Sequence, residues 1–597
     1  MLRRAGARLG PAFAALFLLG AGLRAVDLWR PIDGTIRDPW RECDIGAIAR
    51  NYDREGMNLL YPRIDWRGDG PGYAEMEFPL FPWLIAVSYR LFGTHEVAGR
   101  LITYAFSLGA LAVYFSLAND LLPAAGSLAA GLFFATSPLV IRISNSLQPD
   151  GLMMLAYLLA AYAFLRWLDQ DTRGWFWLAT GLTALAILAK ANAAHIGLAM
   201  LGWLLHRRGL RALADGRVWA FGALSLLPGA LWYAHAHSLW LRFGNSLGLS
   251  NESHWIGLYF FQDPSFAVRI GRTELVYVWA ISGVIVAAAG LLADRSRDSV
   301  ACALYWLASV AAFYLLAVHT VAATWGAYYH AVAVPAVGLL FGAGVEQAIR
   351  LAADPHRRRL MAAVPAALAG IALLLALRSA HPELRLALAA AFGAASAALA
   401  FGRLPSQPEP HAGSLWRLRS PALSSAATAL AVLLLPGAVV AAPVLELRRV
   451  VADFHPSRMQ PLNACARQFA PLVPPGTLIV SSGGKCADRY GRPLAYNASY
   501  MFYWMDRKGF SVCEDEQSLE RLESLVSRGA RYFVAERDVL RAKPGFEEAV
   551  RGADRVVAEC PEALLFDLSQ RATPGPPSLE PGYGFGASGA GTPGSPQ

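Results

Sequence analysis

The sequence predicts a polytopic α-helical membrane protein with a small α/β domain near its C-terminus. Of the 597 residues, 55% are hydrophobic and only 16% are charged, and the mean hydropathy is +0.36. These values exclude an ordinary soluble globule. Apolar runs long enough to cross a bilayer as helix recur up to Leu447 and then stop, which marks the boundary between the two predicted parts.

About thirteen membrane-spanning helices are expected from these runs. The first follows a basic start and could be mistaken for a signal peptide, but Arg24 and Asp27 follow without a small-residue cleavage site, so it is expected to be retained. The predicted spans lie near residues 10–28, 96–118, 122–141, 150–168, 174–190, 191–206, 217–235, 273–293, 299–318, 327–349, 359–378, 383–402 and 421–443.

Arginine placement predicts the orientation of these helices. Basic residues mark loops that stay inside, and they gather near the N-terminus and around residues 207–217, 350–359 and 403–419. An odd number of spans then places both the first loop (residues 29–95) and the C-terminal region outside. The net charge of +9 is explained by this topology signal, so we expect no nucleic-acid partner.

The first outer loop is rich in carboxylates, which suits chemistry on a lipid-linked substrate. Apolar spacing from Asp44 to Tyr52 predicts a short interfacial helix, with Asp44 either as its N-cap or as a catalytic base. A second surface helix is expected from Pro79 to about Gly93, too short to cross the membrane. The loop acids are Glu42, Asp44, Asp65, Asp69, Glu75 and Glu77.

Residues 448–570 read as an α/β domain. Buried strands are expected at 477–480 and 531–535, with a helix at 518–527 between them. Residues 571–597, rich in Gly, Pro and Ser, are predicted to be a disordered tail.

The cysteines of this region predict disulfides. Four of the six lie past residue 447, which suits one or two bridges in an oxidising compartment, although the pairing stays open. A zinc site is the weaker alternative, because no Cys-x-x-Cys spacing occurs. A histidine metal site is also disfavoured, because side chains two apart do not share a helical face; its members would be His235, His237 and His254.

Other polar residues in the predicted helical part are candidates for substrate binding. Asp150 follows Pro149 at the start of a span, where it would either begin the helix or contribute to a site. Lys190 is the only lysine before Arg350, and would either snorkel to the interface or bind a phosphate. The remaining candidates are Arg100, an intramembrane cation, and Tyr328, Tyr329 and His330 at the outer end of a span.

These features together resemble the GT-C glycosyltransferases of family 39, over roughly residues 10–350. The resemblance rests on a first helix, an acidic outer loop with two surface helices, Pro149-Asp150 opening a later helix, and the Tyr328-Tyr329 pair ahead of Pro335. That family includes protein O-mannosyltransferases and bacterial lipid A aminoarabinose transferases. The resemblance implies that Asp44, which matches the early loop acid, is the catalytic base. Glu77 stands where many bacterial relatives have lysine.

The predicted function is that of an inverting glycosyltransferase of the bacterial inner membrane. It would move a sugar from a polyprenyl-phosphate donor to an acceptor hydroxyl on a protein, lipid or polysaccharide, at the outer face. Besides Asp44, the residues predicted to bind substrate are Glu42, Asp65, Glu75, Glu77, Arg100, Asp150, Lys190, Tyr329 and His330. The reaction needs no nucleotide-binding fold and no redox cofactor, and a divalent metal ion stays an open alternative. The competing classes are a flippase for lipid-linked glycans and a non-catalytic sugar-binding protein.

Overall fold

A computed structural model of the chain describes most of its residues. These are 10–353, with gaps at 27, 34–38, 249–262, 292–297 and 324, then scattered positions between 359 and 396, and finally 437–448, 459–487 and 499–571. Most of the predicted spans 359–378 and 383–402, part of the span 421–443, and nearly all of the predicted tail lie outside the described residues.

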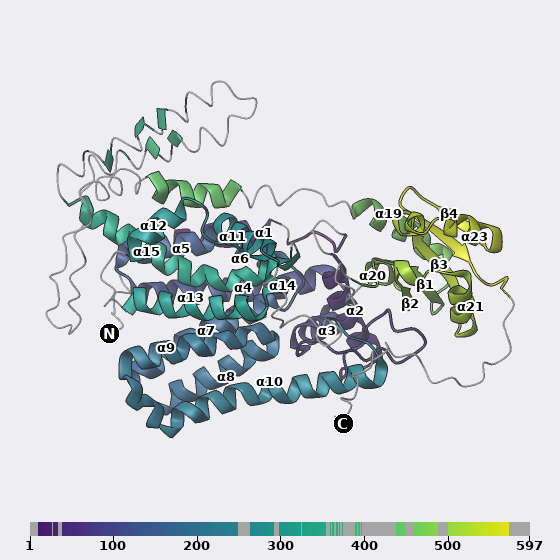
Figure 1. Ribbon diagram of the computed structural model, residues 1–597, viewed down its shortest axis with the longest axis horizontal. Coiled ribbons are helices and arrows are strands. Elements are labelled where there is room, and N and C mark those ends of the chain that lie inside the picture. The colour runs from purple at the N-terminus through teal and green to yellow at the C-terminus, as the bar shows by residue number, and fades with distance from the viewer. Residues whose placement is uncertain are drawn as a thin grey trace, which may run out of the picture. The chain divides into compact units, whose positions relative to one another are not determined.

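The chain divides into two compact units, and neither is a continuous segment (Figure 1). The helical unit comprises residues 1–29, 100–229 and 254–455, and the loop–sheet unit comprises 30–99, 230–253 and 456–597. This division differs from the predicted one, because the first outer loop groups with the C-terminal domain rather than with the membrane helices. The helices α4 (Glu96–Leu121) and α10 (Gly216–Phe243) run across the boundaries between units.

The helical unit is built from helices of very different length. Its remaining elements are α1 (Gly10–Ala25), α5 (Ala124–Thr136), α6 (Pro138–Asn145), α7 (Asp150–Gln170), α8 (Arg173–Ala189), η1 (Ala191–His195), α9 (Ile196–Arg208), η2 (Leu210–Ala214), α11 (Ser265–Thr273), the π-helical turn η4 (Glu274–Val278), α12 (Gly283–Leu291), α13 (Asp298–Leu316), α14 (Val318–Ala322), η5 (Trp325–Ala333) and α15 (Val334–Leu351).

Four described helices are long and apolar enough to cross a membrane, namely α4, α7, α13 and the continuous stretch Gly326–Leu351. Two further candidates are bent: α5 and α6 meet at 51°, and the segment Ser265–Val278 meets α12 at 92°. The bends lie where Pro138 restarts a helix and where Ala280 and Ile281 take positive φ angles of 53° and 56°. The expected count of thirteen is therefore not reached among the described residues.

The loop–sheet unit contains a five-stranded mixed sheet of order β2-β1-β3-β5-β4. Strands β1 to β3 run parallel and the β4–β5 hairpin is antiparallel to β3. Its elements are α2 (Pro39–Glu55), α3 (Leu80–Phe92), α19 (Gln460–Phe469), η6 (Ala470–Leu472), β1 (Leu478–Ser482), α20 (Ser499–Met505), β2 (Lys508–Val512), η7 (Glu514–Glu516), α21 (Leu519–Ser527), β3 (Ala530–Glu536), α22 (Arg537–Ala542), α23 (Phe546–Ala553), β4 (Arg555–Glu559) and β5 (Ala563–Asp567).

The elements of the sheet follow from local sequence signals. Strands β1 and β3 and helix α21 fall on the two strands and the helix that periodicity predicts. Ser518 caps α21 by accepting a hydrogen bond of 3.0 Å from the backbone N–H of Arg521. Apolar cores cover both faces of the sheet, one including Phe533 and Phe566 and the other including Phe469 and Phe502.

The first loop is joined to this sheet by backbone and packing contacts. Gly68 N–H donates to the carbonyl of Gly509 at 2.6 Å, and Gly509 N–H donates to the carbonyl of Asp65 at 3.1 Å. Gly46 lets α2 approach α20, since a Cβ there would lie 2.7 Å from the ring of Tyr503. The loop and the C-terminal domain therefore belong to one compact unit. Their position at the outer face of the membrane stays a prediction.

Two disulfides hold the C-terminal domain. Cys465 of α19 is joined to Cys560 in the β4–β5 turn, and Cys486 is joined to Cys513 after β2. The prediction of one or two disulfides is confirmed, and the pairing that the sequence left open is now assigned. The other two cysteines, Cys43 and Cys302, are buried thiols.

Candidate active site

Helix α2 carries Asp44 in its second turn. The helix begins at Pro39 and has Glu42 in its first turn, so of the two alternatives for Asp44 the N-cap is wrong. Proline at the first helical position and an early acid are ordinary start signals, and they place the start five residues ahead of Asp44. Capping therefore does not account for this aspartate, whose side chain is buried at 1% exposure.

The two carboxylate oxygens of Asp44 have different surroundings. Oδ1 accepts a hydrogen bond of 2.8 Å from Trp66 Nε1. Oδ2 is buried and has no hydrogen-bond partner in the part of the chain that the structure describes. Burial raises the pKa of Asp44 to about 7, although the hydrogen bond from Trp66 and the positive charge of Arg41 act in the opposite direction. The group is thus able to gain and lose a proton near neutral pH.

Asp65, in contrast, has both oxygens engaged. Arg50 donates to Oδ2 at 2.7 Å, and Asn51 donates to Oδ1 at 2.8 Å. Both partners come from α2, so Asp65 ties the following loop segment to that helix. Asp65 is a predicted substrate-binding residue, and its charge is already compensated by Arg50.

The remaining loop acids do not form a single cluster. Glu75 accepts a hydrogen bond of 2.6 Å from the hydroxyl of Ser246, and Glu77 pairs with Arg41. Glu42 is buried at 2% exposure. Asp69 is exposed and pairs with Arg528 at 2.6 Å. Their separate surroundings leave Asp44 as the acid with the clearest opportunity for proton transfer.

The helical unit holds a second polar group around Lys190. Its ammonium lies 2.8 Å from Asp150 Oδ1 and 3.0 Å from Oδ2, and it stands over the rings of Tyr328 and Tyr329 at 4.3 and 4.6 Å from their centroids. Both charged side chains are buried, at 7% and 2% exposure. Lys190 therefore does not snorkel to an interface, and the structure brings together candidates that the sequence proposed on separate grounds.

Arg100 and His330 have other partners. Arg100 is buried and donates to the carbonyl of Asn145 at 2.5 Å. His330 is fully buried; Nδ1 lies 2.6 Å from Glu274 Oε1, and Nε2 lies 2.9 Å from the carbonyl of Val321. Both ring nitrogens of His330 are thus engaged with groups of the protein.

Two residues around these groups were missed by the sequence analysis. Glu274 accepts hydrogen bonds from Tyr314 at 2.7 Å and Trp279 at 2.9 Å as well as its contact with His330. A signal for it existed, because it is the only charged residue in the predicted span 273–293. Trp66, the partner of Asp44, carried no such signal, because it lies 22 positions further along the chain in a loop without a periodic pattern.

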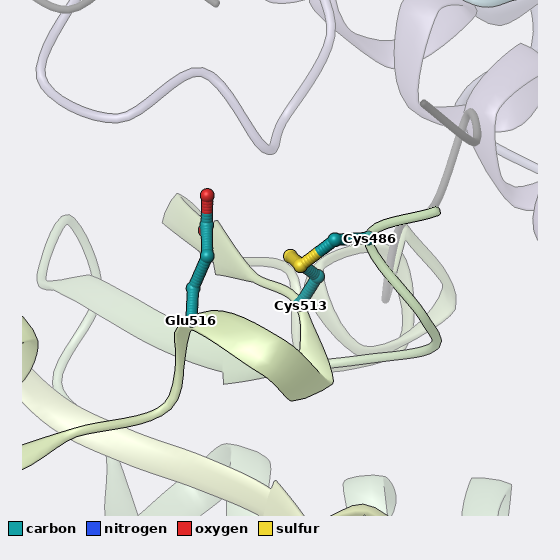
Figure 2. A group of neighbouring side chains, drawn as sticks. All are labelled: Cys486, Cys513 and Glu516. Carbon is teal, nitrogen blue, oxygen red and sulfur yellow. A yellow bond between two sulfur atoms is a disulfide. The ribbon is translucent and has the colours of Figure 1, made fainter. Parts of the chain in front are cut away.

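Potential metal ligands gather at one place among the described side chains. One group of three potential ligands occurs among them, Cys486, Cys513 and Glu516, but Figure 2 shows the two sulfurs joined in a disulfide, which removes the thiolates that a metal would need. Of the three histidines considered, His235 contacts the carbonyl of Leu60 at 2.9 Å and His237 lies 3.6 Å from Glu75. His254 lies outside the described residues.

The fold is that of the GT-C membrane glycosyltransferases, which confirms the resemblance found in the sequence. The chain is similar to ArnT from Cupriavidus metallidurans, solved bound to undecaprenyl phosphate, with 17% identity, a TM-score of 0.55, and coverage of 94% of this chain and 98% of that one. The apo structure of the same protein gives 15% identity and a TM-score of 0.56 over the same shares.

A family model adds a local match. Residues 71–233 match the model described as dolichyl-phosphate-mannose-protein mannosyltransferase. This segment includes Asp150 and Lys190 but begins after Asp44. A comparison with curated proteins finds no match.

Proposed function

We propose that this protein is an inverting glycosyltransferase that moves a sugar from a polyprenyl phosphate to an acceptor hydroxyl. The GT-C fold supports the reaction class. The donor class is supported by the similar ArnT structure, which is described as bound to undecaprenyl phosphate. The arginine-rich loops support placing the loop–sheet unit at the outer face of the inner membrane.

The observation that carries the proposal is the second oxygen of Asp44. Oδ2 is buried, accepts no hydrogen bond from the described residues and belongs to a carboxyl whose pKa is raised to about 7. A general base needs a free lone pair and a pKa near the working pH. Of the loop acids, Asp44 is the one to which the structure gives both properties.

In the proposed reaction, Asp44 Oδ2 removes the proton from the acceptor hydroxyl as its oxygen attacks the anomeric carbon. The bond between that carbon and the phosphate oxygen breaks, and the polyprenyl phosphate leaves with the electron pair. A single displacement inverts the configuration at the anomeric carbon. General-base assistance of this kind contributes roughly 10² to 10⁴ in rate.

The leaving phosphate needs positive charge more than it needs a proton, because it is a weak base. Lys190 is the candidate for this role in the helical unit. Asp150 and the faces of Tyr328 and Tyr329 hold its ammonium in place, so little reorganisation would be required for it to bind a phosphate group.

The test compares Asp44→Asn with Asp69→Asn in a transfer assay on purified protein with a polyprenyl-phosphate sugar. Asparagine keeps the shape of Asp44 and can accept the bond from Trp66, so the fold should survive while transfer falls by about two orders of magnitude or more. Asp69 is an exposed acid of the same loop, and its variant should keep near-normal transfer. A fully active Asp44→Asn protein would remove Asp44 as the base, and wild-type protein that yields no glycosylated product would favour a flippase.

A further inference from the structure

A cavity of about 260 Å³ lies within the loop–sheet unit, between helix α2 and helices α19 and α20. Gly46, Arg50 and Arg54 line it from α2, Arg467 from α19, and Tyr503 and Trp504 from α20. Pockets for drug-sized ligands measure about 300–1,000 Å³. The cavity therefore fits a compact group such as one sugar unit rather than an extended chain.

This cavity is separate from the side of α2 that carries Asp44. Residues 46, 50 and 54 are spaced by four and share one helical face. Asp44 is roughly 160° around the helix from Gly46, at about 100° per residue. The cavity and the proposed base Asp44 therefore lie on different faces of α2.

The charges in the cavity are only partly compensated. Asp506 lies 3.0 Å from Arg50 and 2.9 Å from Arg54. It follows α20 with a φ of 52°, in the left-handed region that glycine adopts most easily. Arg467, however, is exposed and forms no ion pair or hydrogen bond with any other residue that the structure describes. The cavity thus offers a guanidinium to an anionic ligand.

The aromatic side chains are fixed before any ligand arrives. Trp504 Nε1 donates to the carbonyl of Ile32 at 2.6 Å, and the hydroxyl of Tyr503 donates to Glu96 at 3.1 Å. Arg50 stands over the ring of Tyr503 at 4.8 Å. A rigid indole beside carboxylate, amide and guanidinium groups suits a sugar, because its apolar ring face packs on an aromatic ring while its hydroxyls meet polar groups.

We propose that this cavity binds one anionic sugar unit, bearing a carboxylate or a phosphate, with Arg467 as its charge partner and Trp504 beside its ring. Asn463, which also lines the cavity, would meet the hydroxyls. Assigning the sugar to the acceptor glycan rests on the proposed glycosyl transfer. The binding itself does not, because it needs no donor and no reaction.

The proposal is tested by isothermal titration calorimetry on the full chain in nanodiscs. The ligands are a glucuronate-terminated disaccharide, a hexose 6-phosphate, a neutral glucose disaccharide and inorganic phosphate. One of the two anionic sugars should bind, and it should bind at least about tenfold more tightly than the neutral sugar or inorganic phosphate. The preferred sugar identifies the anionic group as carboxylate or phosphate.

The variants locate the binding. Arg467→Gln should weaken it by about tenfold or more, the usual effect of losing a charge-assisted hydrogen bond. Arg521→Gln, on the exposed side of α21 and outside the cavity, should bind normally. The proposal is overturned if no anionic sugar binds, if Arg467→Gln binds as wild type does, or if the neutral sugar or inorganic phosphate binds equally well. If the wild-type protein binds the anionic sugar but transfers no sugar to an acceptor, the result counts against the glycosyltransferase proposal alone and leaves the binding site intact.

Discussion

Asp44 in the loop–sheet unit and Asp150 in the helical unit are both buried aspartates, yet their partners differ. Asp150 has both oxygens within 3.0 Å of the Lys190 ammonium. Asp44 has one neutral indole donor and one oxygen without a hydrogen-bond partner among the described residues. The charge of Asp150 is compensated by a cation of the protein, whereas burial beside a neutral donor raises the pKa of Asp44 to about 7. The comparison assigns charge placement to Asp150 and proton transfer to Asp44.

The largest effect is expected from breaking the charge pair. Lys190→Met leaves Asp150 buried without the cation, which typically costs about 3–5 kcal/mol. The variant should therefore lose thermal stability as well as transfer. Thermal unfolding of the purified protein and the transfer assay measure the two effects separately.

A double variant serves as the control. In Lys190→Met with Asp150→Leu the buried charge is gone, so much of the stability should return while transfer stays low. If Lys190→Met is as stable as wild type, Lys190 does not compensate a buried charge on Asp150. The proposed difference between Asp150 and Asp44 would then be wrong.

A smaller effect is expected from Trp66→Phe. The indole bond lowers the pKa of Asp44, so its loss should raise that pKa by about one to two units, given about 1.5–3 kcal/mol for a hydrogen bond to a charged group. Transfer at pH 7 should then fall roughly tenfold and recover at higher pH. Transfer rates of the two proteins from pH 5 to 9 provide the measurement, and a variant with the wild-type profile would show that Trp66 does not tune the base.

The smallest effect on transfer is expected at Glu536, a buried acid of the C-terminal domain. Burial raises its pKa to about 7, against the effect of a hydrogen bond from Tyr500. A carboxyl whose folded pKa exceeds its unfolded value stabilises the fold least when ionised, so stability should fall as pH rises from about 4.5 to about 7. Glu536→Gln should reduce that dependence, as measured by melting temperature at pH 5 and pH 8. The pH dependence of transfer by Glu536→Gln should match that of wild type. A shifted dependence would mean that Asp44 is not the source of the pH dependence of transfer.

The sequence identified many of the individual site residues, but it did not predict which of them contact one another. Asp150 and Lys190 were each singled out by helix position and by the rarity of lysine, but their pairing depends on how α7 and α8 pack. The contact between Trp66 and Asp44 depends on the path of the loop, which has no periodic pattern. The start of α2 at Pro39 could have been predicted from proline at the first helical position. The count of thirteen membrane helices stays a prediction, because several predicted spans lie mainly outside the described residues. Hydropathy also gave no sign of the break before Pro138.

The grouping of the first loop with the C-terminal domain was beyond sequence reasoning for a related reason. It depends on contacts more than 400 residues apart in the chain, such as that of Arg50 with the carbonyl of Tyr503. Nothing in the local composition of either segment indicates its partner. The arginine pattern predicted only that both segments lie on the same side of the membrane.

The most direct test of Asp44 as the base is the pH dependence of kcat/KM for wild-type transfer. The proposal predicts a rate that rises with pH through a midpoint near 7, because ionisation of Asp44 creates the base. The residual activity of Asp44→Asn should lack this rise. A wild-type profile that is flat between pH 5 and 8, or a rise that persists unchanged in Asp44→Asn, would contradict the assignment.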